Sequence, residues 1–254
     1  MLSSLRARLA TSRPSPATPA ALARMLLRAP GTVLWLAALV VTGVLSGELD
    51  ERSLDDRLLA ASTNLENLSH RPVRVLVDSA LWDSHSVVWL LLVLGAVSWT
   101  VERWLGTPRW VAVLFGAHVI GTLVSQGVVA VQIALGLAPS SAAVVLDYGV
   151  SYAMAGALGV LTYRLPPRWR VLYVAVALAD FTFPFWAPGH APVTFTDLGH
   201  LVALLTGLAA HRLAPRRGRS GGTADQELDA LVADTLEGEH VLVDQATTVG
   251  GPTG

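Results

Sequence analysis

The sequence lacks cysteine and lysine and carries few charged residues for its length. Without cysteine there is no disulfide and no thiolate metal site. Only 15% of the residues are charged, whereas a soluble domain usually carries about 25%. Because lysine is absent, all 18 basic residues are arginine, a usage typical of GC-rich coding sequences and of bacteria such as actinobacteria. The shortage of charge argues against an ordinary soluble domain.

Long apolar stretches take the place of the missing charges. Hydrophobic residues make up 52% of the chain, and most charges lie in the two tails and one long loop. In bilayer hydrocarbon about 20 consecutive apolar residues make one helical crossing. Only helices and closed barrels satisfy every backbone polar group there, and these runs are too long and continuous for barrel strands. The sequence therefore predicts an all-α, polytopic membrane protein.

Six membrane spans are expected between two polar tails. The long loop at 48–85 is acidic and has the pattern of short amphipathic helices that can lie on the membrane surface. Residues 1–30 form a tail rich in Arg, Pro and Ser, and residues 213–254 form an acidic tail that is expected to be disordered. The first apolar run has no clear cleavage site, so we interpret it as a retained helix. The expected spans are about residues 31–47, 86–104, 110–134, 142–163, 171–187 and 194–211.

The arginines are unequally distributed between the two sides of the predicted membrane domain. With the amino terminus inside, the cytoplasmic segments hold five, two, three and four arginines, which is 14 of the 18. The other four all lie in the loop at 48–85. Cytoplasmic segments carry the excess of positive charge in membrane proteins. We therefore expect both termini to be cytoplasmic and the location to be a bacterial plasma membrane.

Five polar residues stand out within the expected spans, where burying a polar group in lipid is costly and marks a candidate functional position. Ser151 and His200 both belong to spans that enter from the outer face, roughly 9 to 14 Å deep at 1.5 Å per residue. His118, Asp147 and Asp180 are interpreted first as structural, with a proton path through His118 as the alternative.

Small residues place Ser151 and His200 on helix faces that can approach each other closely. Ala155 and Gly159 follow Ser151 at intervals of four, and Gly207 shares a helical face with His200. An imidazole next to a serine hydroxyl can take its proton and so create a nucleophile. The alternative is a structural serine that bonds to the carbonyl one turn earlier. The spacing alone leaves both possibilities open.

Three short motifs, in the right order and in the right spans, resemble the rhomboid intramembrane serine proteases. The resemblance covers about residues 30–212, and six spans with a long first outer loop agree with it. The motifs are, in chain order, Glu102-x-x-x-Gly106 with Arg109-Trp110, Gly149-x-Ser151 with Gly156 and Gly159, and His200-Leu201 with Gly207.

This resemblance implies a six-helix rhomboid-like bundle with a Ser-His dyad. Ser151 would attack the scissile carbonyl, and His200 would act as the general base. The implied partner is another membrane protein, a substrate or a client within the lipid bilayer, cut near its helix end at the outer face. The resemblance implies no metal, no cofactor and no nucleic acid.

The chain departs from the family pattern around the dyad. Tyr152 stands where a glycine usually follows the serine, and Trp89 stands where the family has an asparagine that helps to hold the oxyanion. His85 lies near the family's oxyanion histidine, so we take it, Gly149 and Tyr152 as candidate supporting residues. Asp197, one turn before the dyad histidine, either orients that histidine or caps the last span.

Two other functions remain open from the sequence. A catalytically inactive rhomboid-like protein would bind membrane-protein clients through the same fold, and Trp89 and Tyr152 favour it. A small transporter would use the polar residues of the spans as a path. Those residues do not form a run from one face to the other, and the sequence has no internal repeat of the kind many transporters carry.

Overall fold

The computed structural model describes residues 26–82, 90–187 and 193–215, and this part of the chain is helical, as the sequence predicts. Short 3₁₀ segments cover Ser140–Val144, Thr162–Arg164 and Ala210–Leu213, and a π-helical turn covers Leu90–Leu94. The α-helices described are α3 (Pro30–Gly47), α4 (Glu51–Ala61), α5 (Leu65–His70), α6 (Pro72–Asp78), α8 (Gly95–Leu105), α9 (Thr107–Ala134), α10 (Ser151–Leu161), α11 (Pro167–Trp186) and α12 (Phe195–Ala209).

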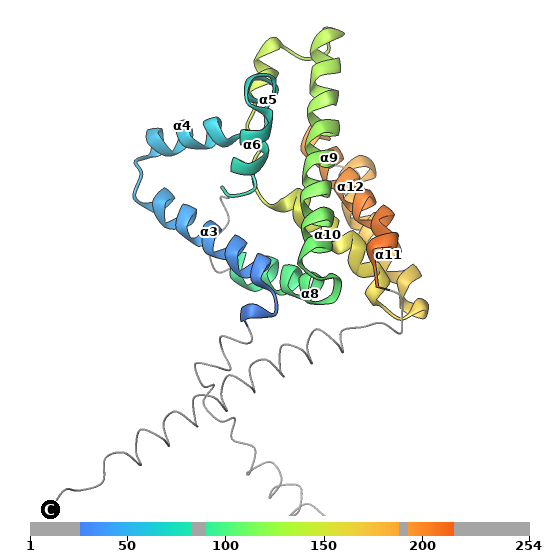
Figure 1. Ribbon diagram of the computed structural model, residues 1–254. Coiled ribbons are helices and arrows are strands. Elements are labelled where there is room, and N and C mark those ends of the chain that lie inside the picture. The colour runs from blue at the N-terminus through green and yellow to red at the C-terminus, as the bar shows by residue number, and fades with distance from the viewer. Residues whose placement is uncertain (1–25, 83–89, 188–192, 216–254) are drawn as a thin grey trace, which may run out of the picture. The chain divides into compact units, whose positions relative to one another are not determined.

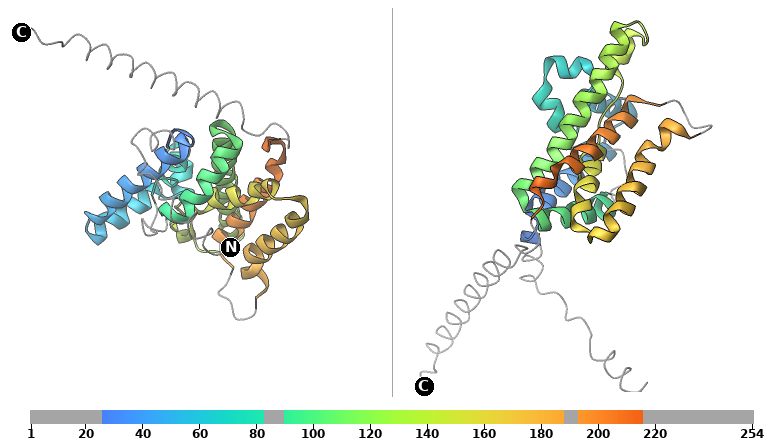
Figure 2. Two further views of the ribbon diagram at one scale, coloured as in Figure 1. Left: turned by 90° about the horizontal axis from the view of Figure 1, so that it is seen from below. Right: turned by 90° about the vertical axis from the view of Figure 1, so that its right-hand side faces the viewer.

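Helices α9, α10 and α12 lie side by side and form the core of the described region (Figure 1, Figure 2). Glycines permit their close approach. A Cβ on Gly207 of α12 would collide with the backbone carbonyl of Gly156 in α10, and a Cβ on Gly159 would collide with the carbonyl of Leu204. The small-residue faces expected from the sequence therefore do face each other.

Helix α3 is fastened to the bundle at its first turn by a buried carboxylate from α8. Glu102 is 1% exposed. Its oxygens accept hydrogen bonds from the backbone N–H groups of Gly31 at 2.9 Å and Thr32 at 2.6 Å, and from the Thr107 hydroxyl at 2.7 Å. The first N–H groups of a helix have no partner within the helix. Glu102 supplies that partner from a different helix.

Helix α11 is the least embedded of the longer helices. It packs mainly on α12, and none of its residues is fully buried. It lies at the outside of the core in both side views (Figure 1, Figure 2). Its apolar side chains, among them Val171, Val176 and Phe183, are exposed. This surface needs an apolar environment.

Two of the described helices, α3 and α9, are long and apolar enough to cross a membrane. Helix α3 buries only Thr32 and Leu39 within the bundle. An exposed apolar surface of this size on a helix is unfavourable in water and favourable in hydrocarbon. The other spans expected from the sequence do not meet the same test of length and hydropathy within the described residues.

The expected helix over 142–163 is shorter than the sequence predicts. Residues 140–144 form a 3₁₀ turn, the chain then runs without helix, and α10 begins only at Ser151. Gly149 has a φ of 115°, a backbone conformation that only glycine adopts easily. Its N–H donates to the Ser79 carbonyl at 2.9 Å. Contacts with the loop that follows α3, which is expected on the outer side and is called the outer loop below, thus hold this segment out of the helix, although its composition is apolar.

The outer loop forms three short helices, α4, α5 and α6, where the sequence predicts amphipathic ones. Asp50 caps α4 and Asn64 caps α5 through hydrogen bonds to backbone N–H groups. The loop also reaches α3, because the Trp35 indole donates to the Ala80 carbonyl at 2.9 Å and the Thr42 hydroxyl donates to the Leu81 carbonyl at 2.6 Å. These bonds place the end of the loop beside the membrane helices.

Candidate active site

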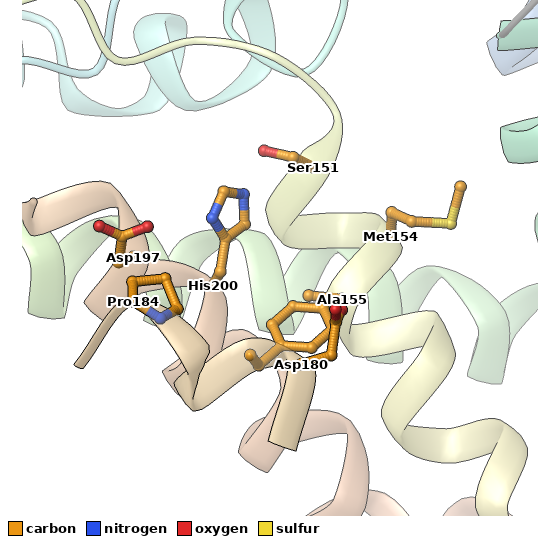
Figure 3. A pocket seen from close by; sticks show the side chains of 8 residues that line it. Ser151, Met154, Ala155, Asp180, Pro184, Asp197 and His200 are labelled. Carbon is orange, nitrogen blue, oxygen red and sulfur yellow. The ribbon is translucent and has the colours of Figure 1, made fainter. Parts of the chain in front are cut away.

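Ser151 and His200 line the same cavity, which lies between α10, α11 and α12 and has a volume of about 320 Å³. Figure 3 shows the serine hydroxyl and the imidazole directed into the same space, with Asp197 on the far side of the ring. Two residues 49 positions apart are thus brought together, as their faces predict. Within the described residues no hydrogen bond joins the two side chains. The full lining is Ser151, Met154, Ala155, Asp180, Phe181, Pro184, Asp197 and His200.

Ser151 is the first residue of α10. The sequence predicts instead that it lies well inside a helix that begins near residue 142. The first N–H groups of an α-helix have no acceptor within the helix. The aligned peptide dipoles also favour negative charge at that end. The serine oxygen therefore lies where an oxyanion formed next to it would meet backbone donors.

His200 is held between two aromatic rings. The Tyr152 ring lies edge-on to the imidazole, with centroids 5.0 Å apart and planes inclined by 73°. Phe181 of α11 approaches from another side at 6.4 Å and 72°. Edge-to-face contacts of this kind are favourable and directional. They fix the plane of the imidazole relative to the cavity.

Tyr152 is itself locked in a slot between α9 and α12. It is 3% exposed, and a Cβ on Gly199 would lie 2.5 Å from its Cζ. Its hydroxyl donates to Asp147 Oδ1 at 3.3 Å and lies 3.5 Å from Ser125 Oγ. The residue that departs from the family pattern is therefore the residue that contacts the candidate base.

Asp147 joins this tyrosine to α9 and to the outer loop. Its Oδ2 accepts from Gln126 Nε2 at 2.9 Å. Its backbone N–H donates to Ser62 Oγ at 2.8 Å, and its carbonyl accepts from the Thr63 N–H at 2.8 Å and the Thr63 hydroxyl at 2.9 Å. These contacts agree with the interpretation of Asp147 as a structural residue.

The remaining candidates differ in position: two line the cavity, one lies away from it, and two lie outside the described residues. Asp197 forms a reciprocal capping box with Thr194, whose N–H and hydroxyl each donate to Asp197 Oδ2 at 2.8 Å, so it caps α12 while lining the cavity. The His118 Nε2 lies 3.0 Å from Ser79 Oγ and 3.1 Å from the Leu76 carbonyl oxygen. Asp180 lines the cavity from α11. His85 and Trp89 lie outside the described residues.

Four polar residues that the sequence analysis did not select complete the network: Ser62, Thr63, Ser125 and Gln126. Gln126 carried a usable signal, because it is an amide within an apolar run, where polar side chains are costly. Ser62 and Thr63 carried none, since a polar pair in a polar loop is ordinary. Among the described residues no group of three His, Cys, Asp or Glu side chains could hold a metal ion.

Comparisons with known proteins bear on this geometry. No curated protein and no solved structure matches the chain. The model of one family, described as rhomboid-like protein, matches residues 24–220, which is well over half of the sequence. The match includes all three motifs, the outer loop, and both Ser151 and His200. The chain belongs to the rhomboid-like protein family and is a membrane protein.

Proposed function

We propose that the protein is an intramembrane serine protease that uses Ser151 as the nucleophile and His200 as the general base. The observation that carries the proposal is the single cavity that both side chains line. The proposal includes the topology predicted from the arginines, with six spans and both termini in the cytoplasm. In that orientation the start of α10 lies toward the outer face.

The proposed reaction is acyl transfer through the serine. His200 takes the hydroxyl proton as Ser151 Oγ attacks the scissile carbonyl carbon, and the carbonyl oxygen becomes an oxyanion. Backbone N–H groups in the first turn of α10 stabilise that oxyanion. The C–N bond then breaks, and the imidazolium returns its proton to the leaving amine. Water, deprotonated by the same imidazole, hydrolyses the acyl-serine ester and releases the carboxylate product.

The cavity is suited to a segment that arrives from the lipid. It is bounded on one side by α11, which packs mainly on α12 and exposes its apolar side chains. Met154, Phe181 and Pro184 give the cavity an apolar wall, and Asp180 and Asp197 add carboxylates. An unwinding end of a substrate helix has both apolar side chains and free backbone groups, and this lining can accommodate both.

Labelling with a fluorophosphonate, which reacts with activated serines, tests the proposal. We expect the full chain, in membranes or detergent, to be labelled, and we expect Ser151→Ala to abolish labelling. His200→Ala should slow labelling at least about 100-fold, because a general base contributes about that much or more. Ser141→Ala and His211→Ala are matched controls, since both residues are exposed and lie outside the cavity. Labelling that survives Ser151→Ala would contradict the assignment.

A second function, client binding without catalysis, is favoured by the absence of a Ser151–His200 hydrogen bond within the described residues. It is favoured too by the tyrosine in place of glycine after the serine. A folded wild-type protein that shows no labelling over the whole pH range would favour this function. The transporter alternative has no comparable support from the cavity.

Tyr152 is expected to act as a positioning residue for His200. Tyr152→Ala removes the edge-on ring, and misplacing a catalytic group by about 1 Å can cost about 100-fold in rate. Tyr152→Phe keeps the ring and loses only the hydroxyl contacts, so most of the labelling rate should remain. If Tyr152 had only a structural role, the labelling rate per folded molecule would be the same in both variants as in the wild type. Only the amount of folded protein would then change. The measurement is the labelling rate per folded molecule, with folding followed by thermal unfolding.

A further inference from the structure

A second cavity lies between α3, α6 and α9 and has a volume of about 350 Å³. It shares no lining residue with the Ser-His cavity. Its lining extends from the first turns of α3 and α9, at Gly31 and Trp110, to the residues that follow α6, at Ala80 and Leu81. Pockets of this size are typical of small-molecule and lipid sites. The lining is Gly31, Leu34, Trp35, Val77, Ala80, Leu81, Trp110, Val111, Leu114, Phe115 and His118.

The cavity presents carbon to any occupant. The Trp35 indole N–H is bonded to the Ala80 carbonyl, and the Trp110 indole N–H is bonded to Ser98 Oγ at 3.0 Å. His118 Nε2 is engaged by Ser79 and the Leu76 carbonyl, so Nδ1 is its one nitrogen without a partner among the described residues. A cavity so poor in free polar groups does not hold water well. It is suited to a hydrocarbon chain.

The mouth of the cavity faces the lipid. The cavity lies between α3 and α9, the two described helices that are apolar and long enough to cross a membrane. Leu34 at its edge is 71% exposed, and Val111 and Phe115 on the opposite edge are also exposed. In a bilayer these side chains meet acyl chains. One such chain can therefore enter the cavity without crossing water.

A cationic hollow lies on the other side of the segment 72–82. It has a volume of about 150 Å³ and is lined by Arg57, Ala60, Ala61, Arg74, Asp78 and Trp82. Val77 and Leu81 line the apolar cavity, while their chain neighbours Asp78 and Trp82 line the hollow. Consecutive Cα atoms are about 3.8 Å apart. The two sites are therefore separated by the thickness of one chain segment, within the reach of a single lipid.

The charges of the hollow favour an anion. The Arg57 guanidinium lies 5.4 Å from the centroid of the Trp82 ring. Arg74 Nε forms an exposed ion pair with Asp78 Oδ2 at 3.2 Å. Two arginines against one carboxylate leave a net positive charge, and arginine suits phosphate because its planar donors can bind two oxygens.

We propose that this region binds one anionic phospholipid, with an acyl chain in the apolar cavity and the phosphate at Arg57 and Arg74. The site is independent of the Ser-His chemistry. In the proposed topology the hollow belongs to the outer loop and the cavity extends from it toward the cytoplasmic ends of α3 and α9. A phospholipid of the outer leaflet has its headgroup and chain in that same order.

The test is photolabelling in liposomes with phosphatidylglycerol that carries a diazirine on one acyl chain. The full-length protein is reconstituted, irradiated and digested, and labelled peptides are identified by mass spectrometry. We expect labels concentrated near Leu34 in α3 and Val111 in α9. Filling the cavity with Ala80→Phe, or from the opposite wall with Val111→Trp, should reduce these labels about tenfold. Val73→Phe on exposed α6 surface is the control for added bulk and should change nothing.

The headgroup part is tested with the same diazirine lipid bearing a choline headgroup. Wild-type protein should prefer the glycerol headgroup about fivefold, on the scale of one arginine near an anionic lipid. The double variant Arg57→Gln, Arg74→Gln should lose that preference, whereas Arg52→Gln on the same helix α4 should keep it. Labels spread evenly over exposed helix faces, or unchanged in both cavity-filling variants, would overturn the chain site. Equal labelling by the two headgroups in wild-type protein would overturn the preference for an anionic lipid, because both lipids carry the phosphate and only the glycerol lipid has a net negative charge.

Discussion

Replacing Glu102 with alanine is expected to destabilise the protein by about 3 kcal/mol or more. The buried carboxylate satisfies two backbone N–H groups of α3 and the Thr107 hydroxyl. Each buried donor that loses its acceptor costs about 1–3 kcal/mol. The N-terminus of α3 would then separate from α8, and the Trp35–Trp110 contact, with centroids 6.0 Å apart, would be lost with it. Thermal unfolding in detergent, followed by tryptophan fluorescence, measures the effect.

Two variants define what this result means. Glu102→Gln keeps the shape and one carbonyl acceptor, so its unfolding temperature should fall between those of wild type and Glu102→Ala. Glu66→Ala removes an exposed glutamate of α5 and should leave the unfolding temperature nearly unchanged. An unfolding temperature for Glu102→Ala equal to that of the wild type would show that the cap contributes nothing.

Gly207→Leu is expected to disrupt the packing of α10 against α12. Any Cβ at this position collides with the carbonyl oxygen, carbonyl carbon and Cα of Gly156. These are backbone atoms, so no change of side-chain rotamer can relieve the collision. Overpacking of a tight contact typically costs about 1–3 kcal/mol and sometimes more. The helices must separate, and Ser151 would move away from His200. We expect a lower unfolding temperature together with loss of fluorophosphonate labelling.

Gly127→Ala is the matched control for this prediction. Gly127 lies within α9, and a Cβ there would meet nothing within 4 Å. Alanine is favoured over glycine inside a helix by about 1 kcal/mol. This variant should therefore be as stable as the wild type or more stable, and it should be labelled normally. If Gly207→Leu behaved in the same way, the close crossing of α10 and α12 would be wrong.

Most helix positions follow from local signals in the sequence. Helix α3 covers Pro30–Gly47 where 31–47 was expected, and α12 covers Phe195–Ala209 where 194–211 was expected. Both have a continuous apolar run, and each has a start signal. Proline begins α3, and the Thr194–Asp197 capping box begins α12. These signals act between near neighbours in the chain, so a single sequence reveals them.

The start of α10 could not be predicted in the same way. Residues 142–150 are apolar enough to continue a helix, and the sequence predicts them to be part of one. The structure holds this segment in an irregular conformation through bonds to Ser62, Thr63 and Ser79, which are 70 or more residues away in the chain. Contacts between such distant residues leave no periodic pattern. The expected start of this helix, at residue 142, was therefore wrong, and Ser151 is the first residue of α10.

The role of Glu102 and that of Tyr152 were hidden for the same reason. Glu102 stood out only as part of a family motif, and its partners Gly31 and Thr32 are 71 and 70 residues away. Tyr152 stood out as a departure from the family pattern, which favoured an inactive protein. In the structure it contacts the candidate base directly. The departure in sequence is therefore compatible with Ser151 and His200 lining one cavity.

The most direct test of the central claim, that His200 activates Ser151, is the fluorophosphonate labelling rate of Ser151 as a function of pH. An imidazole accepts a proton only when it is neutral, so the rate in wild-type protein should rise with pH through the titration of one group and then level off. His200→Ala should show a rate at least about 100-fold lower without that rise, while the His211→Ala control keeps the wild-type profile. Equal rates and profiles in wild-type protein and His200→Ala would contradict the proposed pair.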